Sequence, residues 1–469
     1  MFMSIVNADE TKITDTGLPK ELERSTLCLP DVPESEVVRH YTNLASKNFG
    51  VDNGPYPLGS CTMKYNPKYA DRISSLEKFT DVHPYQDEST VQGILELMYD
   101  AERKLAAIAG MDSVTLQPAA GAHGEFTAML IVRAYHNDNN EERDEVIIPD
   151  SAHGTNPASA AMAGYKVIEL PSAPDGSVDL NALKAAVSSR TAAFMLTNPN
   201  TLGIFEKNIV KISDIVHGAG ALMYYDGANL NAIMGVTTPG DMNFDIVHFN
   251  VHKTFAAPHG GGGPGSGPVG VKKRFAKYLP SPTIKKVKEK YVLAHNEKSI
   301  GKIRSFYGNL NVVLRGYAYI LRMGSEGLKD ATVRAVLNSN YLKELLKEDY
   351  DIPFGDLKKH EFVLSASGLK REKGIKAMDI AKRMIDHHIH PPTVYFPMLV
   401  DESMMFEPTE DCSLKELDMI ADVLIKIANE DPDIVINAPH RSPVSRVDET
   451  KAAKDMILSV RYMKKKEQQ

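Results

Sequence analysis

The chain has 469 residues, of which 43% are hydrophobic and 25% are charged, and its formal net charge is −7. These proportions are those of an ordinary soluble globular protein. A mildly acidic chain has no general electrostatic attraction to nucleic acid or to anionic membranes. We therefore expect neither a nucleic acid nor a membrane among its partners.

The cysteines and the N-terminal residues favour a cytoplasmic protein. Cys28, Cys61 and Cys412 include no CxxC pair, and an odd number over this length argues against a disulfide framework. No apolar stretch approaches the ~20 residues that a bilayer-spanning helix needs. Residues 1–20 lack the apolar core of a signal peptide and contain acidic residues, which transit peptides avoid. A reducing cytoplasm is the compartment that fits these features.

The chain opens with an irregular, proline-rich segment, residues 1–85. Within it, Asp31 and Pro33 form a start signal that predicts a helix over residues 34–47. Residues 56–64 are small and polar and predict a loop. Apolar residues at helical spacing then predict an amphipathic helix over 88–109, which ends at Gly110.

From residue 114 onwards, short apolar runs alternate with helical stretches. This alternation predicts an α/β fold with a mostly parallel sheet and helices on both faces. The predicted strands are 114–116, 146–148, 167–170, 192–196, 222–225 and 246–249. The predicted helices between most of them are 124–135, 157–164, 180–188 and 206–218. Ligands of such sheets bind beyond the C-terminal ends of the strands.

A second, smaller α/β domain is predicted after a helix over 309–323, which Gly324 would end. Its predicted helices are 331–347, 377–387 and 414–428. The chain is thus expected to have three parts: an N-terminal segment with an active-site loop (1–85), a large domain (86–325) and a C-terminal domain (326–469).

Two strand ends in the predicted large domain carry candidate ligand-binding groups. The first is a turn of small residues that includes Ala120, Gly121 and Ala122. Backbone N–H groups at such a helix start bind phosphate, although a plain tight turn has the same composition. The second carries His153, whose imidazole could stack on a planar ring. The alternative is that His153 or Asn156 caps the following helix.

A third strand ends in Asp226, which is followed by Gly227 and Ala228. A buried carboxylate here can keep a pyridine nitrogen protonated, and small neighbours such as Ala228 let the ring approach closely. The alternative is an ordinary turn aspartate.

The fourth strand end carries Lys253, which lies between an apolar run and a glycine tract at 260–263. A lysine that is partly desolvated or near another cation can lose its proton and form a Schiff base with an aldehyde. A surface lysine followed by a flexible linker has the same local pattern. Together, however, the four strand ends describe one ligand, pyridoxal 5′-phosphate (PLP).

The motifs around these residues resemble those of the P-proteins, the decarboxylating glycine dehydrogenases of the glycine cleavage system. More narrowly, the chain resembles subunit 2 of the P-proteins that are split into two chains, and the resemblance covers nearly its whole length. The motifs that carry it are Leu58–Lys64, Gln117–Glu125, Ser151–Ser159, Asp226–Asn229, His252–Thr254 with Pro258–Gly265, and Glu407–Glu410.

The resemblance implies a fold-type I, aspartate-aminotransferase-like architecture. It implies that Lys253 binds PLP as a Schiff base, that Asp226 pairs with the ring nitrogen and that His153 stacks on the ring. It also implies that the turn at 120–122 binds the phosphate, with His252 as a second phosphate contact. No metal is implied.

The implied reaction is decarboxylation of glycine, with transfer of the aminomethyl group to the lipoyl arm of H-protein and release of CO2. The implied partners are P-protein subunit 1, in a heterotetramer with two copies of each chain, and lipoylated H-protein. For the lipoyl step the sequence offers three candidate segments: Ser60–Lys64, Glu407–Glu410 and Phe306–Asn309.

Three other interpretations compete with this one. The first is another fold-type I PLP-dependent decarboxylase or a desulfurase. The second is a non-catalytic scaffold subunit, against which the four strand-end motifs argue. The third is a nucleotide-binding protein that uses the glycine tract at 260–263. That tract follows a lysine and lacks the strand–GxGxxG–helix order.

Overall fold

The computed structural model describes residues 10–12, 17–23, 26–260, 265–354 and 357–459. The chain divides into two compact units, residues 1–53 and 54–469. The first unit contains β1 (Glu10–Lys12), the 3-10 helix η1 (Lys20–Leu22), β2 (Thr26–Pro30) and α2 (Glu34–Ala45). Pro33 immediately precedes α2, so the helix predicted over 34–47 is confirmed and ends two residues early.

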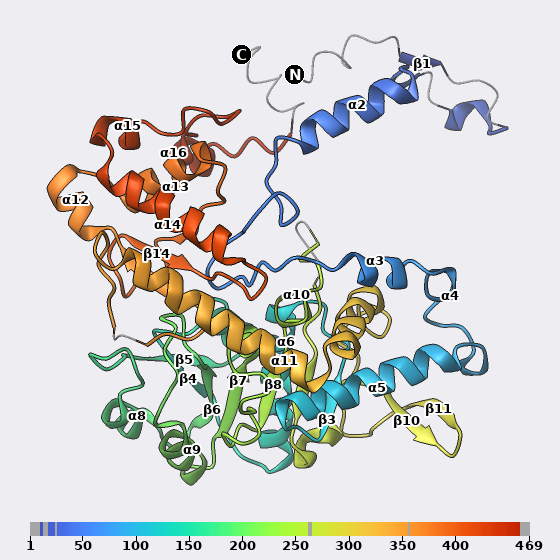
Figure 1. Cartoon of the computed structure of the whole chain (residues 1–469). Coiled ribbons are helices and arrows are strands. Elements are labelled where there is room, and N and C mark those ends of the chain that lie inside the picture. The colour runs from blue at the N-terminus through green and yellow to red at the C-terminus, as the bar shows by residue number, and fades with distance from the viewer. Residues whose placement is uncertain (1–9, 13–16, 24–25, 261–264, 355–356, 460–469) are drawn as a thin grey trace. The chain divides into compact units, whose positions relative to one another are not determined.

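A seven-stranded sheet organises the second unit (Figure 1). Its order is β3-β9-β8-β7-β6-β4-β5. The strands are β3 (Ser113–Thr115), β4 (Glu145–Pro149), β5 (Lys166–Leu170), β6 (Thr191–Thr197), β7 (Leu222–Asp226), β8 (Ile246–His248) and β9 (Val269–Val271). Every strand predicted from the sequence is present, and the mostly parallel α/β fold is confirmed. Only β9 pairs antiparallel to its neighbours β3 and β8. The other strands therefore all end at one edge of the sheet.

Helices cover both faces of this sheet. The helix α6 (Gly121–Asp138) packs on one face with the side chains of Val146, Met195, Tyr224 and Ile246. On the other face α5 (Gln92–Ala109) and α9 (Ile209–Gly218) pack with the alternate strand residues, which are Ile147, Phe194, Leu196, Met223, Tyr225 and Val247. This alternation has the two-residue period of a strand, and burial of both faces explains why the strands read as continuous apolar runs.

The remaining elements of the large sheet's surroundings are short. They are α3 (Lys68–Ser74), α4 (Glu77–Thr80), η2 (Glu88–Thr90), α7 (Asn156–Met162), α8 (Leu180–Ala186), η3 (Gly227–Ala232), α10 (Val251–Thr254) and η4 (Lys273–Tyr278). A hairpin of β10 (Thr283–Val287) and β11 (Lys290–Ala294) pairs antiparallel and was not predicted. None of the described helices combines the length and the apolar character needed to cross a membrane.

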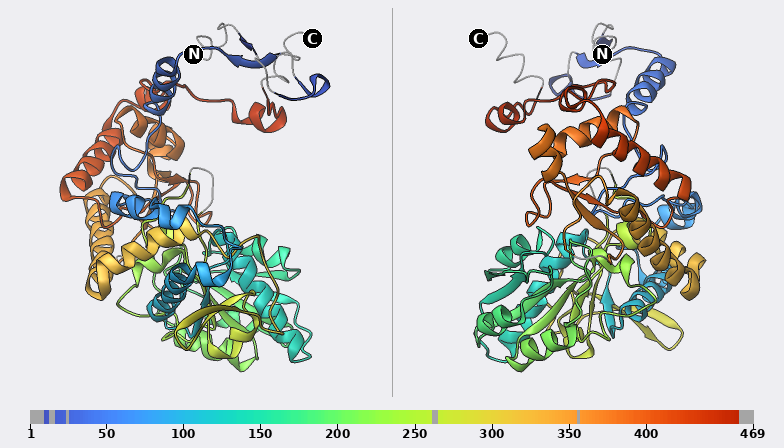
Figure 2. Two further views of the ribbon diagram at one scale, coloured as in Figure 1. Left: turned by 90° about the vertical axis from the view of Figure 1, so that its right-hand side faces the viewer. Right: turned by 60° about the vertical axis from the view of Figure 1, so that its left-hand side comes forward.

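One long helix, α11 (Leu310–Leu346), connects the large sheet to the C-terminal elements (Figures 1 and 2). Gly324 interrupts it with φ 62° and ψ −175°, and the helix then resumes. The predicted helix end at Gly324 is therefore confirmed, because α11 consists of two helices that meet at a kink at this residue. The predicted helices 309–323 and 331–347 are its two parts.

The C-terminal residues form a small antiparallel sheet of order β12-β14-β13, with strands Phe362–Ser365, Ser403–Phe406 and Thr393–Val394. Its core includes residues of α11, α13 (Ala377–Asp386) and α14 (Leu414–Asn429), as predicted for the last two helices. Short helices α12 (Ser367–Lys373), α15 (Pro432–Ile436) and α16 (Glu449–Lys454) complete this part. The domain limits at 85/86 and 325/326 stay predictions.

Substitution of Gly110, which ends α5, tests whether the left-handed backbone at this position requires glycine. Gly110 has φ 65° and ψ 34°, and a Cβ there would lie 2.4 Å from Thr238 Oγ1. We expect Gly110→Ala to lower the free energy of unfolding by about 1–2 kcal/mol, because L-residues are strained in the left-handed region. Gly93, in the same helix, has nothing within 4 Å of its Cβ position. Gly93→Ala is therefore expected to be neutral or to stabilise by up to about 1 kcal/mol. Denaturant unfolding measures the free energy of unfolding of both variants. Equal values for the two variants would contradict the left-handed backbone at Gly110.

Candidate active site

The C-terminal ends of β3, β4, β7 and β8 surround a cavity of about 330 Å³. It is lined by all but one of the site residues predicted from the sequence: Gly121, Ala122, His153, Asp226, Ala228, His252 and Lys253. The exception is Ala120, which precedes α6 with extended backbone. The structure thus brings the predicted residues together, while their roles toward a cofactor stay predictions.

Lys253 lies in α10, one short turn of helix after β8. Its Nζ donates a hydrogen bond of 2.7 Å to the carbonyl oxygen of Ser60. Its neighbour His252 accepts the Ser266 N–H on Nδ1 at 3.3 Å. Burial, helped by His259 and Lys253, lowers the pKa of His252 to about 3. An uncharged imidazole therefore stands beside the lysine at neutral pH.

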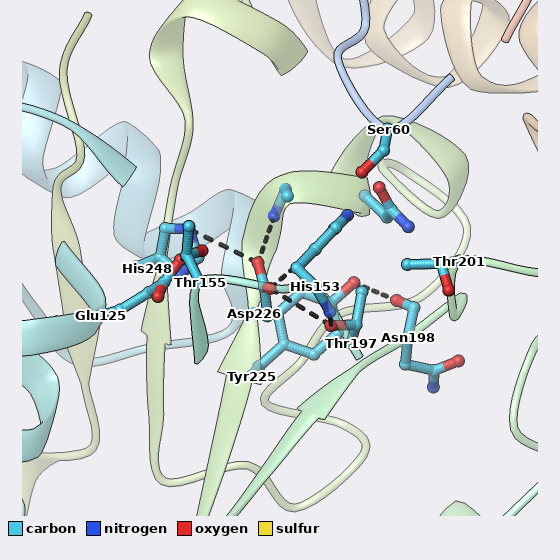
Figure 3. A network of polar contacts seen from close by, with 12 residues as sticks. Ser60, Glu125, His153, Thr155, Thr197, Asn198, Thr201, Tyr225, Asp226 and His248 are labelled. Atoms are coloured by element: carbon cyan, nitrogen blue, oxygen red, sulfur yellow. Dashed lines mark hydrogen bonds and ion pairs between the residues drawn. The ribbon is translucent and has the colours of Figure 1, made fainter. Parts of the chain in front are cut away.

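Asp226 is fully buried at the end of β7 and accepts hydrogen bonds on both carboxylate oxygens (Figure 3). Oδ1 accepts the Ala228 N–H at 3.0 Å. Oδ2 accepts the Thr197 hydroxyl at 3.2 Å and lies 2.7 Å from His153 Nδ1. Burial alone would raise the pKa of Asp226, but His153 and His248 outweigh it and hold that pKa below its usual range. The carboxylate is therefore ionised at neutral pH.

His153 makes its contact with Asp226 through Nδ1, so the ionised carboxylate places a proton on that nitrogen. Its Nε2 is buried and has no hydrogen-bond partner among the described residues. A buried polar atom without a partner is rare in native proteins, and here it belongs to a residue that lines the cavity. His153 Nε2 is therefore a candidate contact for a ligand bound in this cavity.

The first turn of α6 lines another wall of the cavity with Gly121 and Ala122. A Cβ on Gly121 would lie 2.2 Å from Asn250 Oδ1, so a larger residue here would force the Asn250 side chain to move. Asn309 Nδ2 holds the preceding turn by donating to the carbonyl oxygens of Ala119 and Gly265. The free N–H groups and positive dipole end of a helix start suit an anion.

Glu125, one turn further along α6, also lines the cavity and was not predicted as a site residue. It is buried and accepts hydrogen bonds of 2.8 Å from the hydroxyls of Thr155 and Ser159. Burial and the charge of Asp226 raise the pKa of Glu125 to about 7. The sequence signal was its i+4 spacing from Gly121, which places both residues on one helix face.

The predicted loop Ser60–Lys64 reaches the cavity and is bound by the C-terminal sheet region. Ser60 lines the cavity, and its N–H donates to Glu361 at 2.8 Å. The Thr62 N–H and hydroxyl both donate to Glu407, and Lys64 forms a 2.7 Å ion pair with Glu410. Two of the three segments proposed for the lipoyl step therefore touch each other.

The third proposed segment lies elsewhere. Phe306, Tyr307 and Gly308 line a separate cavity of about 350 Å³, beside residues of α5. Of the glycine tract at 260–263, residues 261–263 lie outside the described residues, as does Pro264. Gly265, at the end of this segment, would place a Cβ 2.1 Å from His252 Nδ1.

Two buried carboxyl groups, those of Glu361 and Glu407, accept hydrogen bonds from the loop Ser60–Lys64. Within the described chain, His360, Glu361 and Glu407 are the one set of three potential metal ligands whose ligand atoms lie within 4.8 Å of one another. Each carboxyl already accepts hydrogen bonds, Glu361 from Ser60 and Asn229 and Glu407 from Thr62. Burial raises the pKa of Glu407 to about 7, and burial with the charge of Glu407 raises that of Glu361 well above its ordinary value. The pair therefore holds a proton at neutral pH.

Comparison with known proteins gives this geometry its context. A family model of the C-terminal domain of glycine dehydrogenase matches residues 331–444, and a model of class-V aminotransferases matches residues 97–263. A protein of Thermoplasma acidophilum named probable glycine dehydrogenase (decarboxylating) subunit 2 is 57% identical over 445 residues, which cover 95% of this chain and 93% of that protein. A protein of Caldanaerobacter subterraneus with the same name is 56% identical over 456 residues, which cover 96% and 94%.

The chain belongs to the family of decarboxylating glycine dehydrogenase subunit 2 proteins. A crystal structure of a glycine decarboxylase (P-protein) of the glycine cleavage system, in inhibitor-bound form, has the same fold. The TM-score is 0.73 at 21% identity, over 87% of this chain and 93% of that one. The cysteine desulfurase CsdA of Escherichia coli follows with a TM-score of 0.62 at 12% identity, over 80% and 94%. The fold is that of a class of PLP-dependent enzymes.

The residues around the cavity fit PLP. A helix start with a closely packed glycine suits the phosphate, and a lysine amine and a buried anionic carboxylate line the same cavity. The unpartnered Nε2 of His153 provides a contact for a polar or planar ligand.

Substitution of Glu361 tests the protonated carboxyl pair. A carboxyl whose folded-state pKa is raised stabilises the fold below its unfolded pKa, and that contribution is lost as pH rises through the folded pKa. Because glutamine mimics the neutral acid, we expect Glu361→Gln to match the wild type in thermal stability near pH 5 and to exceed it at pH 9. Glu361→Leu leaves the Ser60 N–H and Asn229 amide without an acceptor and is expected to cost about 1–3 kcal/mol.

Thermal unfolding of the purified chain across pH 5–9 measures these differences. If Glu361→Gln destabilised the chain as much as Glu361→Leu at every pH, the Glu361 carboxyl would have to be ionised. The conclusion that the Glu361–Glu407 pair holds a proton would then be wrong.

Proposed function

We propose that this chain is the PLP-binding catalytic subunit of a decarboxylating glycine dehydrogenase. The observation that carries the proposal is the convergence of Lys253, Asp226 and the start of α6 on one cavity, in a member of this family. Relatives named glycine dehydrogenase (decarboxylating) support glycine as the substrate.

In this proposal Lys253 binds the aldehyde of PLP and the first turn of α6 binds the phosphate, with His252 as a further contact. Bound PLP supplies an electron sink that makes loss of CO2 from an amino acid feasible. Asp226 holds the proton on the ring nitrogen, since an ionised buried carboxylate favours a cationic partner. His153 stays fixed by its hydrogen bond to Asp226 and lies against the ring. Gly227 and Ala228 keep the approach to Asp226 free of bulk.

Partners follow from the names of the relatives and from the family resemblance. The name "subunit 2" indicates a partner chain, subunit 1. We propose a heterotetramer with two copies of each chain, in the cytoplasm, which passes the aminomethyl group to the lipoyl arm of H-protein. The loop Ser60–Lys64 is the described segment that supports this step best, because Ser60 lines the cavity and its carbonyl oxygen accepts a hydrogen bond from Lys253. The loop also contains Cys61, which is half-buried. Burial raises the pKa of that thiol, so we assign it no nucleophilic role.

The competing enzyme class is a desulfurase, which the fold alone would allow. The assay that decides is exchange of labelled bicarbonate into the carboxyl of glycine, with subunit 1 and with lipoylated or unlipoylated H-protein. Exchange that requires the lipoyl group supports the proposal. Conversion of cysteine to alanine, with the sulfur released as sulfide by an added thiol reductant and without exchange, would support the desulfurase instead.

Replacement of Lys253 tests the Schiff base directly. Lys253→Arg keeps the positive charge but cannot form a Schiff base with an aldehyde, so we expect loss of the visible absorption band of bound PLP and loss of exchange. Lys207→Arg changes an exposed lysine outside the cavity and serves as the control. Circular dichroism establishes that both variants are folded. A Lys253→Arg protein that kept the band would refute the assignment.

Replacement of Asp226 tests the ring-nitrogen partner. We expect Asp226→Asn to bind PLP equally or more weakly and to lose glycine–bicarbonate exchange by about 10²–10³-fold, because a neutral amide cannot hold the ring proton. Asp245→Asn is the matched control: Asp245 is equally a buried aspartate, but it bonds Met223 N–H, His217 and Arg274 away from the cavity. Near-normal exchange by Asp226→Asn would rule out this role.

A further inference from the structure

The side chain next to Asp226 on the sheet is His248, which no motif assigned. Strands β7 and β8 pair in parallel with Tyr224 opposite Ile246 and Tyr225 opposite Val247, so His248 is the next partner in register, beside Asp226. Because strand side chains alternate, Tyr224 and Asp226 point to the same face of the sheet. Gly124 of α6 lies on that face as well, since its Cβ would be 3.1 Å from His248 Cβ. The side chains of Tyr224, Asp226 and His248 are all fully buried.

Two distances connect these side chains into a row. The Tyr224 hydroxyl lies 2.5 Å from His248 Nδ1, and His248 Nε2 lies 3.5 Å from Asp226 Oδ1 (Figure 3 shows the His248–Asp226 contact). Asn250 is a further polar neighbour of the His248 ring. The row thus runs from a phenol through an imidazole to the carboxylate that faces the cavity.

The protonation states in this row are set by burial. Burial raises the pKa of Tyr224 well above its usual value and lowers that of His248 to about 4, despite the opposing effect of Asp226. Tyr224 therefore keeps its proton and His248 is a neutral imidazole with a single N–H. If that N–H were on Nδ1, the lone pair of Nε2 would point at the Asp226 carboxylate, which is repulsive. With the proton on Nε2, Nδ1 accepts the Tyr224 hydroxyl, and the Nε2–H faces Asp226 Oδ1 across 3.5 Å without forming a hydrogen bond.

We propose that Tyr224 and His248 are a positioning pair that fixes the Nε2–H tautomer of His248 against Asp226 and so holds this carboxylate ionised and oriented toward the cavity. The statement about the tautomer concerns the chain alone. Its consequence for the ring nitrogen of PLP rests on the proposed function. Tyr224 and His248 would act on a ligand only through the Asp226 carboxylate, so we describe them as positioning residues.

The tautomer can be read without cofactor. Full-length PLP-free chain labelled with ¹⁵N-histidine reports Nδ1 and Nε2 separately by their chemical shifts, and His248→Gln assigns the signal. We expect His248 to be protonated on Nε2 alone in the wild type and to become a mixture of tautomers in Tyr224→Phe. A wild-type signal with the proton on Nδ1, or a doubly protonated ring at neutral pH, would overturn the proposal.

The matched control is Tyr225→Phe. Tyr225 is the adjacent buried tyrosine on the opposite sheet face, and its hydroxyl donates to the carbonyl oxygen of Asn198. It loses a buried hydroxyl just as Tyr224→Phe does, so both variants share any general loss of stability. We expect Tyr225→Phe to leave the His248 signal unchanged. An equal shift of that signal in both variants would show a structural effect and would contradict the positioning role.

The PLP-bound chain supplies the second readout. With ¹⁵N-labelled PLP, we expect Tyr224→Phe to lower the pH at which the ring nitrogen loses its proton. We also expect kcat for exchange to fall by about 10–100-fold, the range that outer-shell partners contribute at metal sites, with little change in KM for glycine. His248→Gln keeps an N–H donor near Asp226 and should retain more activity than His248→Leu. Equal activities of these two variants would contradict the role of the donor. Failure of the wild type to bind PLP would refute the proposed function while leaving the tautomer result intact.

Discussion

An ionised carboxylate buried at the end of β7 is the constraint on which this site depends. Burial of an unpaired charge is costly, and a carboxylate avoids protonation in such surroundings only when several donors face it. Asp226 accepts hydrogen bonds from the Ala228 N–H on Oδ1 and from Thr197 and His153 on Oδ2. His248 Nε2 lies 3.5 Å from Oδ1. These groups come from the β4–α7 connection, from β6, from the start of η3 directly after β7, and from β8, so the parallel order of the sheet is what assembles them.

The surrounding titratable groups concentrate charge on this one carboxylate. Burial lowers the pKa values of His248, His252, His259 and His360 to about 3 or 4, so these rings are uncharged at neutral pH. Burial also raises the pKa values of Glu125 and Glu407 to about 7 and raises that of Glu361 well above its ordinary value. A site with many ionisable side chains thus has few charges, and in a medium of low dielectric constant each remaining charge acts strongly on a ligand.

Much of this arrangement could be predicted from the sequence, and the exceptions have physical causes. The parallel strands were visible because both faces are buried, and Lys253, Asp226 and His153 were visible because they follow those strands. The strand β9 was missed because Val269–Val271 is three residues long and contains a glycine. His248 could have been found from strand parity, since it lies in register beside Asp226.

The loop over the cavity could not be predicted in this way. Ser60 meets Glu361 across 301 positions and Thr62 meets Glu407 across 345, and local sequence contains no signal for contacts of that range. The two loop residues also have left-handed backbone, with φ 65° at Ser60 and 44° at Thr62, which non-glycine residues adopt only when their surroundings hold them. Glu361 and Glu407 supply that restraint from the C-terminal sheet, and the carbonyl oxygen of Ser60 in turn accepts the Lys253 amine. The C-terminal part of the chain therefore shapes the cavity through this loop, so a substitution at Glu361 can alter the surroundings of Lys253 without touching it.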